Sequence, residues 1–264
     1  MIGALFGDIV GSIFEWDNRK SKQFDLYQKK MFFTDDSVMT LAIAKALMEH
    51  RDTGKDLGVL TIQNMQDLGR RYPDAGYGGN FELWIYDENP QPYNSWGNGS
   101  AMRVSACGWV AETVEEAKEL SRAVTVVTHN HPEGIKGAEA TAVAIYMARQ
   151  HCSKAEIKAA MQKYYPLQKT LAEIRPEYEY DVSCQGTVPQ AIQAFLEAED
   201  FEDAIRNAIS LGGDSDTLAA ICGSMAEAYF GVEQKQIDFV MGKLDKFLGD
   251  ICEEFGKKYG GMTI

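Results

Sequence analysis

Two short clusters of oxygen-bearing side chains are the part of this sequence best suited to chemistry. One is Thr34-Asp35-Asp36, and the other is Asp214-Ser215-Asp216-Thr217. Each cluster precedes an apolar pattern of helical period, so both should lie in the first turn of a helix. If the two helix starts meet in the fold, their carboxylates would repel one another unless cations lay between them. Hard divalent cations such as Mg²⁺ prefer oxygen ligands, so the clusters predict a site for a pair of such ions.

Helix capping is the simpler explanation for either cluster taken alone. Thr34 suits an N-cap position, and Asp35 and Asp36 in a first turn would complement the helix dipole. Asp214 or Asp216 could cap the later helix in the same way. Capping needs only one or two oxygens, however, and each cluster supplies more than that. Taken together, the two clusters therefore favour metal binding over capping.

A third candidate is the segment from Gly7 to Glu15. Gly7 and Gly11 are four residues apart, which would let a neighbouring helix approach closely if this segment is helical. Glu15 would then stand near the end of the segment. Its position alone fits a surface glutamate equally well.

Two further motifs contain glycine or histidine. The glycine-rich turn at 96–103 runs into a helix start, where backbone N–H groups can face an anion, but it is also compatible with a simple turn. It lacks the lysine and the spacing of a Walker A loop, so nucleoside triphosphate hydrolysis is not indicated. His129 and His131 have no nearby third ligand for zinc, which favours a polar loop that enters a helix.

The elements that must position these residues are predicted to be helices. Met39, Ile43 and Leu47 share one helical face after the first acidic cluster. Similar patterns predict helices over 56–71, 114–128, from Pro132 to beyond Ile145, 153–164, 187–199, 201–211, from Leu218 onward and 235–256. No run alternates with period two between hairpin turns. The expected fold is all-α, with residues 1–264 as a single domain.

Two segments interrupt the helical pattern. Residues 72–99 are rich in glycine, proline and aromatic side chains, and 175–186 form a shorter interruption. Long irregular segments inside a compact protein often carry function. We therefore expect part of a ligand site in 72–99.

Composition restricts the possible partners. The chain has 26 basic and 39 acidic residues and a net charge of −13, which argues against a surface for a nucleic-acid backbone. The five cysteines are widely spaced and form no C-x-x-C pair, so a reduced, cytoplasmic setting is expected. Asp8 interrupts the first apolar stretch before a signal-like core forms, and no run of about 18 apolar residues suggests a membrane span.

Taken in order, five motifs resemble those of the ADP-ribosylglycohydrolase family, which includes the dinitrogenase-reductase-activating glycohydrolase and the ADP-ribosylhydrolases. The likeness spans nearly the whole chain. The motifs are GDIVGSIFE at 7–15, TDDSVMT at 34–40, GNGSAMR at 97–103, THNHP at 128–132 and GGDSDT at 212–217. The resemblance implies a compact orthogonal multi-helix bundle of the ADP-ribosylglycohydrolase type. It also implies a binuclear centre of Mg²⁺ or Mn²⁺ at the bottom of a cleft.

The resemblance assigns roles to individual residues. The implied metal ligands are Thr34, Asp35, Asp36, Asp214, Asp216 and Thr217. The implied catalytic residues are Glu15, as acid or base, with Asp36 and Asp216 as bridging carboxylates. The implied substrate contacts are Gly78, Gly97, Asn98, Gly99, Ser100, Met102 and His129.

The implied function is hydrolysis of the glycosidic bond between ADP-ribose and a protein side chain or small acceptor. Two alternatives stay open. One is a non-catalytic ADP-ribose-binding or structural relative, since a lens crystallin shares the family fold. The other is a two-metal phosphohydrolase. Whether an arginine or a serine linkage is cleaved is left open by the sequence.

Overall fold

The computed structural model describes residues 1–260, and helices dominate this range. Its one β-type pairing is an isolated bridge between Gly97 and Ser183. No helix in this range combines the length and the apolar character needed to cross a bilayer. The helices are α1 (Ile2–Gly11), α2 (Asp35–Thr53), α3 (Leu57–Arg71), α4 (Gly79–Tyr86), α5 (Gly99–Met102), α6 (Ser105–Val110), α7 (Val114–Thr125), α8 (Pro132–Arg149), α9 (Lys154–Met161), α10 (Leu171–Ile174), α11 (Cys184–Glu197), α12 (Phe201–Ile209), α13 (Ser215–Phe230), α14 (Gln234–Met241) and α15 (Lys246–Tyr259). The all-α prediction is confirmed.

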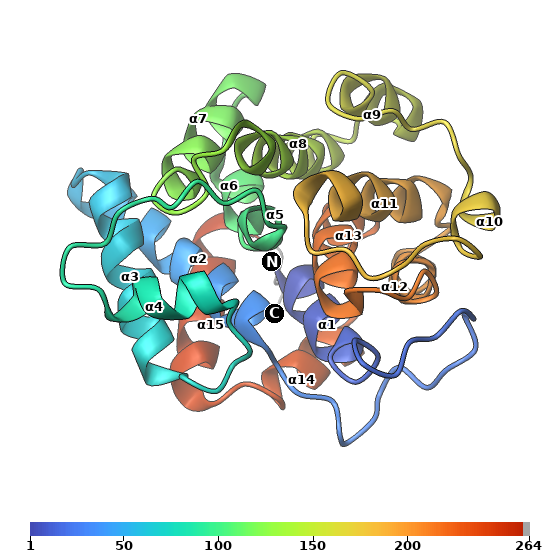
Figure 1. The fold of residues 1–264 in the computed structure, drawn as a ribbon, viewed down its shortest axis with the longest axis horizontal. Helices are drawn as coiled ribbons and strands as arrows, with labels where there is room; N and C mark the ends of the chain where they lie inside the picture. The colour runs from blue at the N-terminus through green and yellow to red at the C-terminus, as the bar shows by residue number, and fades with distance from the viewer. Residues whose placement is uncertain (261–264) are drawn as a thin grey trace.

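Helices α1 and α13 pack against each other in the middle of the molecule (Figure 1). Their backbones are so close that a Cβ atom added at Gly7 would lie 2.1 Å from the carbonyl oxygen of Ala219. A Cβ added at Gly11 would lie 2.4 Å from the Cα of Asp216. Only glycine fits these two positions, as the four-residue spacing predicted. The contact places the start of α13 beside the end of α1.

The remaining helices surround this central pair. Helices α2 and α3 pack together on one side, while α11 and α12 cover α13 on the other (Figure 1). Helix α8 lies across α6, α7 and α13. One hydrophobic cluster runs through all these contacts, and it includes large side chains such as Phe6, Met39 and Phe195. The starts of α2 and α13 therefore rest on a rigid, buried support.

Two predicted boundaries are wrong. The expected helix over 235–256 is two helices, α14 and α15, because the chain turns at Gly242 and Asp245 then caps the second helix by accepting from the N–H of Leu248 at 3.0 Å. The segment 72–99 also contains the short helix α4. Its buried side chains Phe81 and Trp84 pack into the core, and tertiary contacts rather than periodicity determine such a short helix.

Candidate active site

Asp8 of α1 anchors the start of α2. It is fully buried, and its carboxylate accepts hydrogen bonds from the N–H of Thr34 at 3.0 Å, from the Thr34 hydroxyl at 2.6 Å and from the N–H of Ser37 at 3.0 Å. The Ser37 hydroxyl also donates to it. Burial raises the pKa of Asp8 to about 6 despite these donors. Asp8 thus positions the first acidic cluster.

The first cluster lies at the N-terminus of α2. Thr34 caps the helix by accepting from the N–H of Asp36 at 3.3 Å, and the N–H of Asp35 donates to the carbonyl of Ala75 at 2.8 Å. Asp36 is 3 % exposed, and its Oδ2 accepts a hydrogen bond from the Thr217 hydroxyl at 3.3 Å. This contact joins the two acidic clusters directly.

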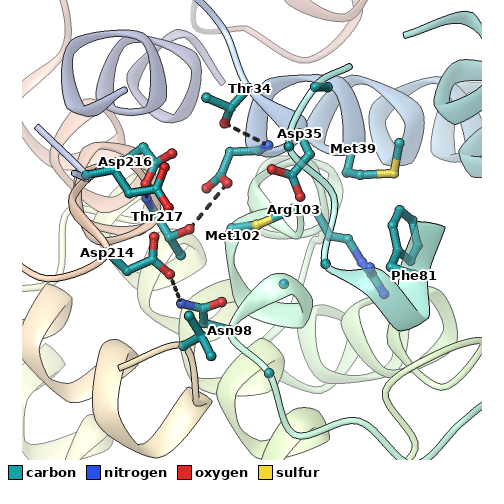
Figure 2. Close-up of a pocket in the computed structure, with 18 of the residues that line it drawn as sticks. Thr34, Asp35, Met39, Phe81, Asn98, Met102, Arg103, Asp214, Asp216 and Thr217 are labelled. Atoms are coloured by element: carbon teal, nitrogen blue, oxygen red, sulfur yellow. Dashed lines mark hydrogen bonds between the residues drawn. The ribbon is translucent and has the colours of Figure 1, made fainter. Parts of the chain in front are cut away.

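The second cluster lies where α12 turns into α13. Gly212 and Gly213 both adopt left-handed backbone conformations, with φ of 72° and 71°, which favour glycine. Asp214 occupies the N-cap position, but its side chain does not cap the helix. It accepts instead from the Asn98 amide at 2.6 Å, as Figure 2 shows. The capping explanation therefore does not account for Asp214.

Glu15 follows α1 and is held beside the second cluster. The Asn18 amide donates to the carbonyls of Glu15 at 2.7 Å and of Gly213 at 3.1 Å, and Asn18 Oδ1 accepts from the N–H of Gly213 at 2.7 Å. The Glu15 carboxylate accepts from the Tyr180 hydroxyl at 2.9 Å. The Tyr180 ring stacks on Trp16, with ring centroids 5.5 Å apart. Asn18 and Tyr180 therefore fix the backbone and the carboxylate of Glu15.

Carboxylate oxygens gather at this end of the site. Glu15, Asp214 and Asp216 each place an oxygen within 4.8 Å of the others. Such a set could hold a hard cation. Asp36 lies next to it through Thr217, and its Oδ1 is buried without a hydrogen-bond partner.

The pKa values reflect this crowding. Burial, followed by repulsion from neighbouring carboxylates, raises the pKa of Asp35, Asp36 and Asp216 well above the usual range. Burial also raises the pKa of Asp214 and of the half-buried Glu15. Within residues 1–260, the ion pairs between side chains closer than 4 Å all lie elsewhere. The cluster holds more negative charge than the protein itself balances.

These carboxylates line one end of a cavity of about 490 Å³. Figure 2 shows Asp214 and Asp216 on one side and Arg103 with Phe81 on the other, with Asp35 and Met102 between them and Met39 near Phe81. The predicted residues that line the cavity are Glu15, Thr34, Asp35, Asp36, Gly78, Gly97, Asn98, Gly99, Met102, His129, Asp214, Asp216 and Thr217. The structure therefore brings nearly all of them to one place.

Ser100 is a predicted substrate contact, but it is not among the residues that line the cavity. It is fully buried, and its hydroxyl donates to the carbonyl of Gly134 at 2.8 Å. Its N–H donates to the carbonyl of Gly97 at 3.4 Å. The side chain of Ser100 thus supports the glycine-rich turn from behind.

Sequence reasoning missed several residues of the site. The single acidic residue in the apolar stretch IGALFGDIVG was a usable signal for Asp8. Asn18 and Tyr180 gave none, because their partners lie 195 and 165 residues away. Arg103 also lines the cavity, and its place in the motif GNGSAMR was a usable signal.

The fold and the cavity together define a class: an all-α protein with an acidic ligand site formed by two helix starts. Residues 1–254 match the sequence pattern of the ADP-ribosylglycohydrolase family, so the chain belongs to that family. It is similar to ADP-ribosylhydrolase ARH3 of Xenopus tropicalis, with 24 % identity over 98 % of this chain and 93 % of the relative. The mouse protein of the same name is 24 % identical over 89 % of this chain and 83 % of the relative.

A solved structure gives the same result for the fold. It is described as an ADP-ribosylglycohydrolase-related protein complex and superposes with a TM-score of 0.69. The match covers 99 % of this chain and 97 % of the other, at 22 % sequence identity. The predicted ADP-ribosylglycohydrolase fold is confirmed.

Proposed function

We propose that this protein is a metal-dependent hydrolase that cleaves the glycosidic bond between ADP-ribose and a modified protein side chain or small acceptor. The observation that carries the proposal is the convergence of both acidic clusters and Glu15 on one cavity. The hydrogen bond of 3.3 Å from Thr217 to Asp36 joins the two clusters. Family membership and the similarity to ADP-ribosylhydrolases support the choice of substrate.

The donor set fits a pair of divalent cations, Mg²⁺ or Mn²⁺. The buried Oδ1 of Asp36 lacks a partner, and the carboxylates raise one another's pKa, so cations would relieve both costs. The proposed ligands are Thr34, Asp35, Asp36, Asp214, Asp216 and Thr217. Bound there, the ions would supply Lewis-acid polarisation of oxygen and a lowered pKa for a water molecule.

Glu15 is the proposed acid or base of the reaction. Its raised pKa brings the carboxyl closer to neutral pH, where a group can both gain and lose a proton. Tyr180 holds one carboxylate oxygen at 2.9 Å and leaves Glu15 at the cavity wall. There it could protonate the leaving acceptor or take a proton from water. Breaking the bond at the anomeric carbon needs such a group.

The wall that runs from Asp214 toward Arg103 suits the rest of ADP-ribose. The turn from Gly97 to Gly99 and the His129 side chain form one wall. Phe81 and Tyr93 line the same region and offer aromatic faces for the adenine ring. The cavity volume of about 490 Å³ lies in the range of small-molecule sites.

Release of ADP-ribose tests the proposal. The protein is incubated with ADP-ribosylated arginine and serine peptides, with and without Mg²⁺ or Mn²⁺. Metal-dependent appearance of free ADP-ribose is the expected result. Binding of ADP-ribose without release would indicate a non-catalytic relative. Phosphate release with an intact glycosidic bond would indicate a phosphohydrolase.

A further inference from the structure

Arg103 is a buried cation at the end of the cavity opposite the carboxylates. Only 1 % of the residue is exposed, yet it lines the cavity. Its Nη2 donates to the Thr128 hydroxyl at 2.6 Å and lies 3.4 Å from Nδ1 of His129. The Thr128 hydroxyl is in turn 2.7 Å from the same Nδ1. Three side chains thus form one closed hydrogen-bonded group.

The chemistry of these groups fixes the position of the imidazole proton. A guanidinium has only donors, so the hydroxyl oxygen of Thr128 must accept from Arg103. The Thr128 hydroxyl then has its own proton free to donate, and Nδ1 of His129 is the atom within reach. A lone pair on Nδ1 accepts that proton, whereas an Nδ1–H would leave the Thr128 hydroxyl proton without an acceptor among its contacts in residues 1–260, so this arrangement assigns the lone pair to Nδ1. The single proton of a neutral imidazole remains on Nε2.

Nε2 is the ring nitrogen on the side of the glycine-rich turn. It lies 3.5 Å from the position that a Cβ would take at Gly99, and 3.6 Å from the corresponding position at Gly97. His129 and both glycines line the cavity. The glycines thus leave room beside the Nε2–H for an atom of a ligand.

The surroundings of His129 favour the neutral ring. Burial, followed by the charge of Arg103, lowers the pKa of His129 well below its usual value. Among residues 1–260, Tyr93 also faces the imidazole, with the two ring centroids 6.0 Å apart, and burial raises the pKa of Tyr93 to about 12. His131 packs instead against Trp96. No carboxylate contributes to the shift of His129.

We propose that Arg103, acting through Thr128, is a positioning residue that holds His129 as a neutral imidazole with its Nε2–H directed at a hydrogen-bond acceptor of the bound ligand. His129 is then a fixed donor beside the Gly97–Gly99 turn and takes no part in proton transfer. The identity of the ligand, ADP-ribose, rests on the proposed function. The tautomer and the charge of the His129 ring do not depend on the proposed function.

The first test reads the ring directly, in metal-free and ligand-free protein. Long-range ¹H–¹⁵N spectra distinguish the two tautomers and the imidazolium. The chain has only four histidines, and loss of one signal in His129→Gln assigns the ring. We expect the Nε2–H tautomer and no titration of His129 between pH 8 and 5.5. A protonated Nδ1, or a ring that titrates near pH 6.5, would overturn the proposal.

A matched pair of variants tests the connection. Thr128→Val keeps the shape but removes the hydroxyl, and should introduce the Nδ1–H tautomer and weaken ADP-ribose binding by about three- to tenfold. Thr128→Ser keeps the hydroxyl and should retain the wild-type spectrum. Arg103→Met should move the pKa of His129 up toward its usual value. Unchanged tautomer in Thr128→Val would overturn the connection even if Arg103→Met does not fold.

The two proposals fail in different ways. If wild-type protein does not bind ADP-ribose, the proposed function is wrong, and the spectrum of His129 alone decides the inference. If wild-type protein binds ADP-ribose and Thr128→Val binds it equally tightly, the claim that the Nε2–H of His129 donates to the ligand is wrong. The proposed function would still stand. A merely structural role of Thr128 would not move the tautomer.

Discussion

The two ends of the cavity are stabilised in different ways. At the acidic end, Asp36 and Asp216 are buried beside other carboxylates that raise their pKa, and Asp36 Oδ1 has no partner. At the opposite end, the Thr128 hydroxyl is hydrogen-bonded to the His129 ring and accepts a hydrogen bond from Arg103. We expect a bound cation to lower the energy of the acidic end, whereas hydrogen bonds within the protein already hold the other end. Removing a side chain should therefore have opposite effects on stability at the two ends.

The largest expected effect is on turnover by Asp216→Asn. Loss of a proposed bridging ligand should reduce kcat by about a thousandfold or more. Because the variant removes a repelling buried charge, its metal-free form should melt at the same temperature as wild type or higher. Steady-state kinetics and thermal melting with EDTA measure both effects. The control is Asp17→Asn, since Asp17 is on the surface with its side chain 77 % exposed. Near-normal activity with saturating metal would contradict the metal assignment.

Glu15→Gln should come second. The amide keeps the size of the side chain but cannot exchange a proton, so kcat should fall by about a hundredfold. The dissociation constant of ADP-ribose should change much less, because the proposed role of Glu15 is at the reacting bond. Isothermal titration and single-turnover kinetics separate the two quantities. An equal loss of rate and affinity would make Glu15 a binding residue.

Stabilisation by metal should depend on pH. Folding raises the pKa of Asp8 to about 6, and it raises the pKa of Asp36 and of Asp216 well above the usual value for a carboxyl group. The protonated forms are therefore favoured in the folded protein. Their contribution to metal-free stability is present at low pH and lost as the pH rises through these raised values. Cations should relieve that loss at pH 7.5 and must compete with protons at pH 5.5.

Thermal melting with EDTA or with Mn²⁺ measures this difference. At a hundred times the dissociation constant, the ion should raise Tm at pH 7.5 by about 5–10 °C. The increase should be smaller at pH 5.5, and smaller at pH 7.5 in Asp216→Asn than in wild type. Comparing the same pH with and without metal cancels the titration of groups outside the site. An equal shift at both pH values would contradict the link to buried carboxylates.

Gly99→Ala should have the smallest effect and tests the cavity wall beside His129. The added methyl would lie in ordinary contact, 3.5 Å from Nε2 of His129, so the fold should tolerate it. It would occupy the room beside the Nε2–H and weaken ADP-ribose binding by a few-fold, about 1 kcal/mol or less. Titration of ADP-ribose measures the change. Gly249→Ala, inside α15 and not among the residues that line the cavity, controls for the general cost of adding a methyl group in a helix, because its Cβ would meet only the end of the flexible Met241 side chain, at 3.3 Å.

Sequence reasoning succeeded where the signal was local. The clusters at 34–36 and 214–217 predicted the starts of α2 and α13. The spacing of Gly7 and Gly11 predicted the close packing of α1 against a neighbouring helix. It failed for Asn18, whose partner Gly213 is 195 residues away, and for α4, which is too short to show a helical period. The direction of Ser100 depends on Gly134 behind it, which no local pattern reveals. The single domain stays a prediction.

The close contact of α1 with α13 has a consequence for how the protein matures. Asp8 and Asp216 are 208 residues apart in the sequence, yet their helices touch backbone to backbone. During synthesis, α1 has no partner until α13 (Ser215–Phe230) has left the ribosome. Contacts so distant in sequence close slowly. The candidate active site should therefore be among the last parts of the molecule to assemble, and nascent chains that end before residue 212 should expose the apolar side chains of α1 to chaperones.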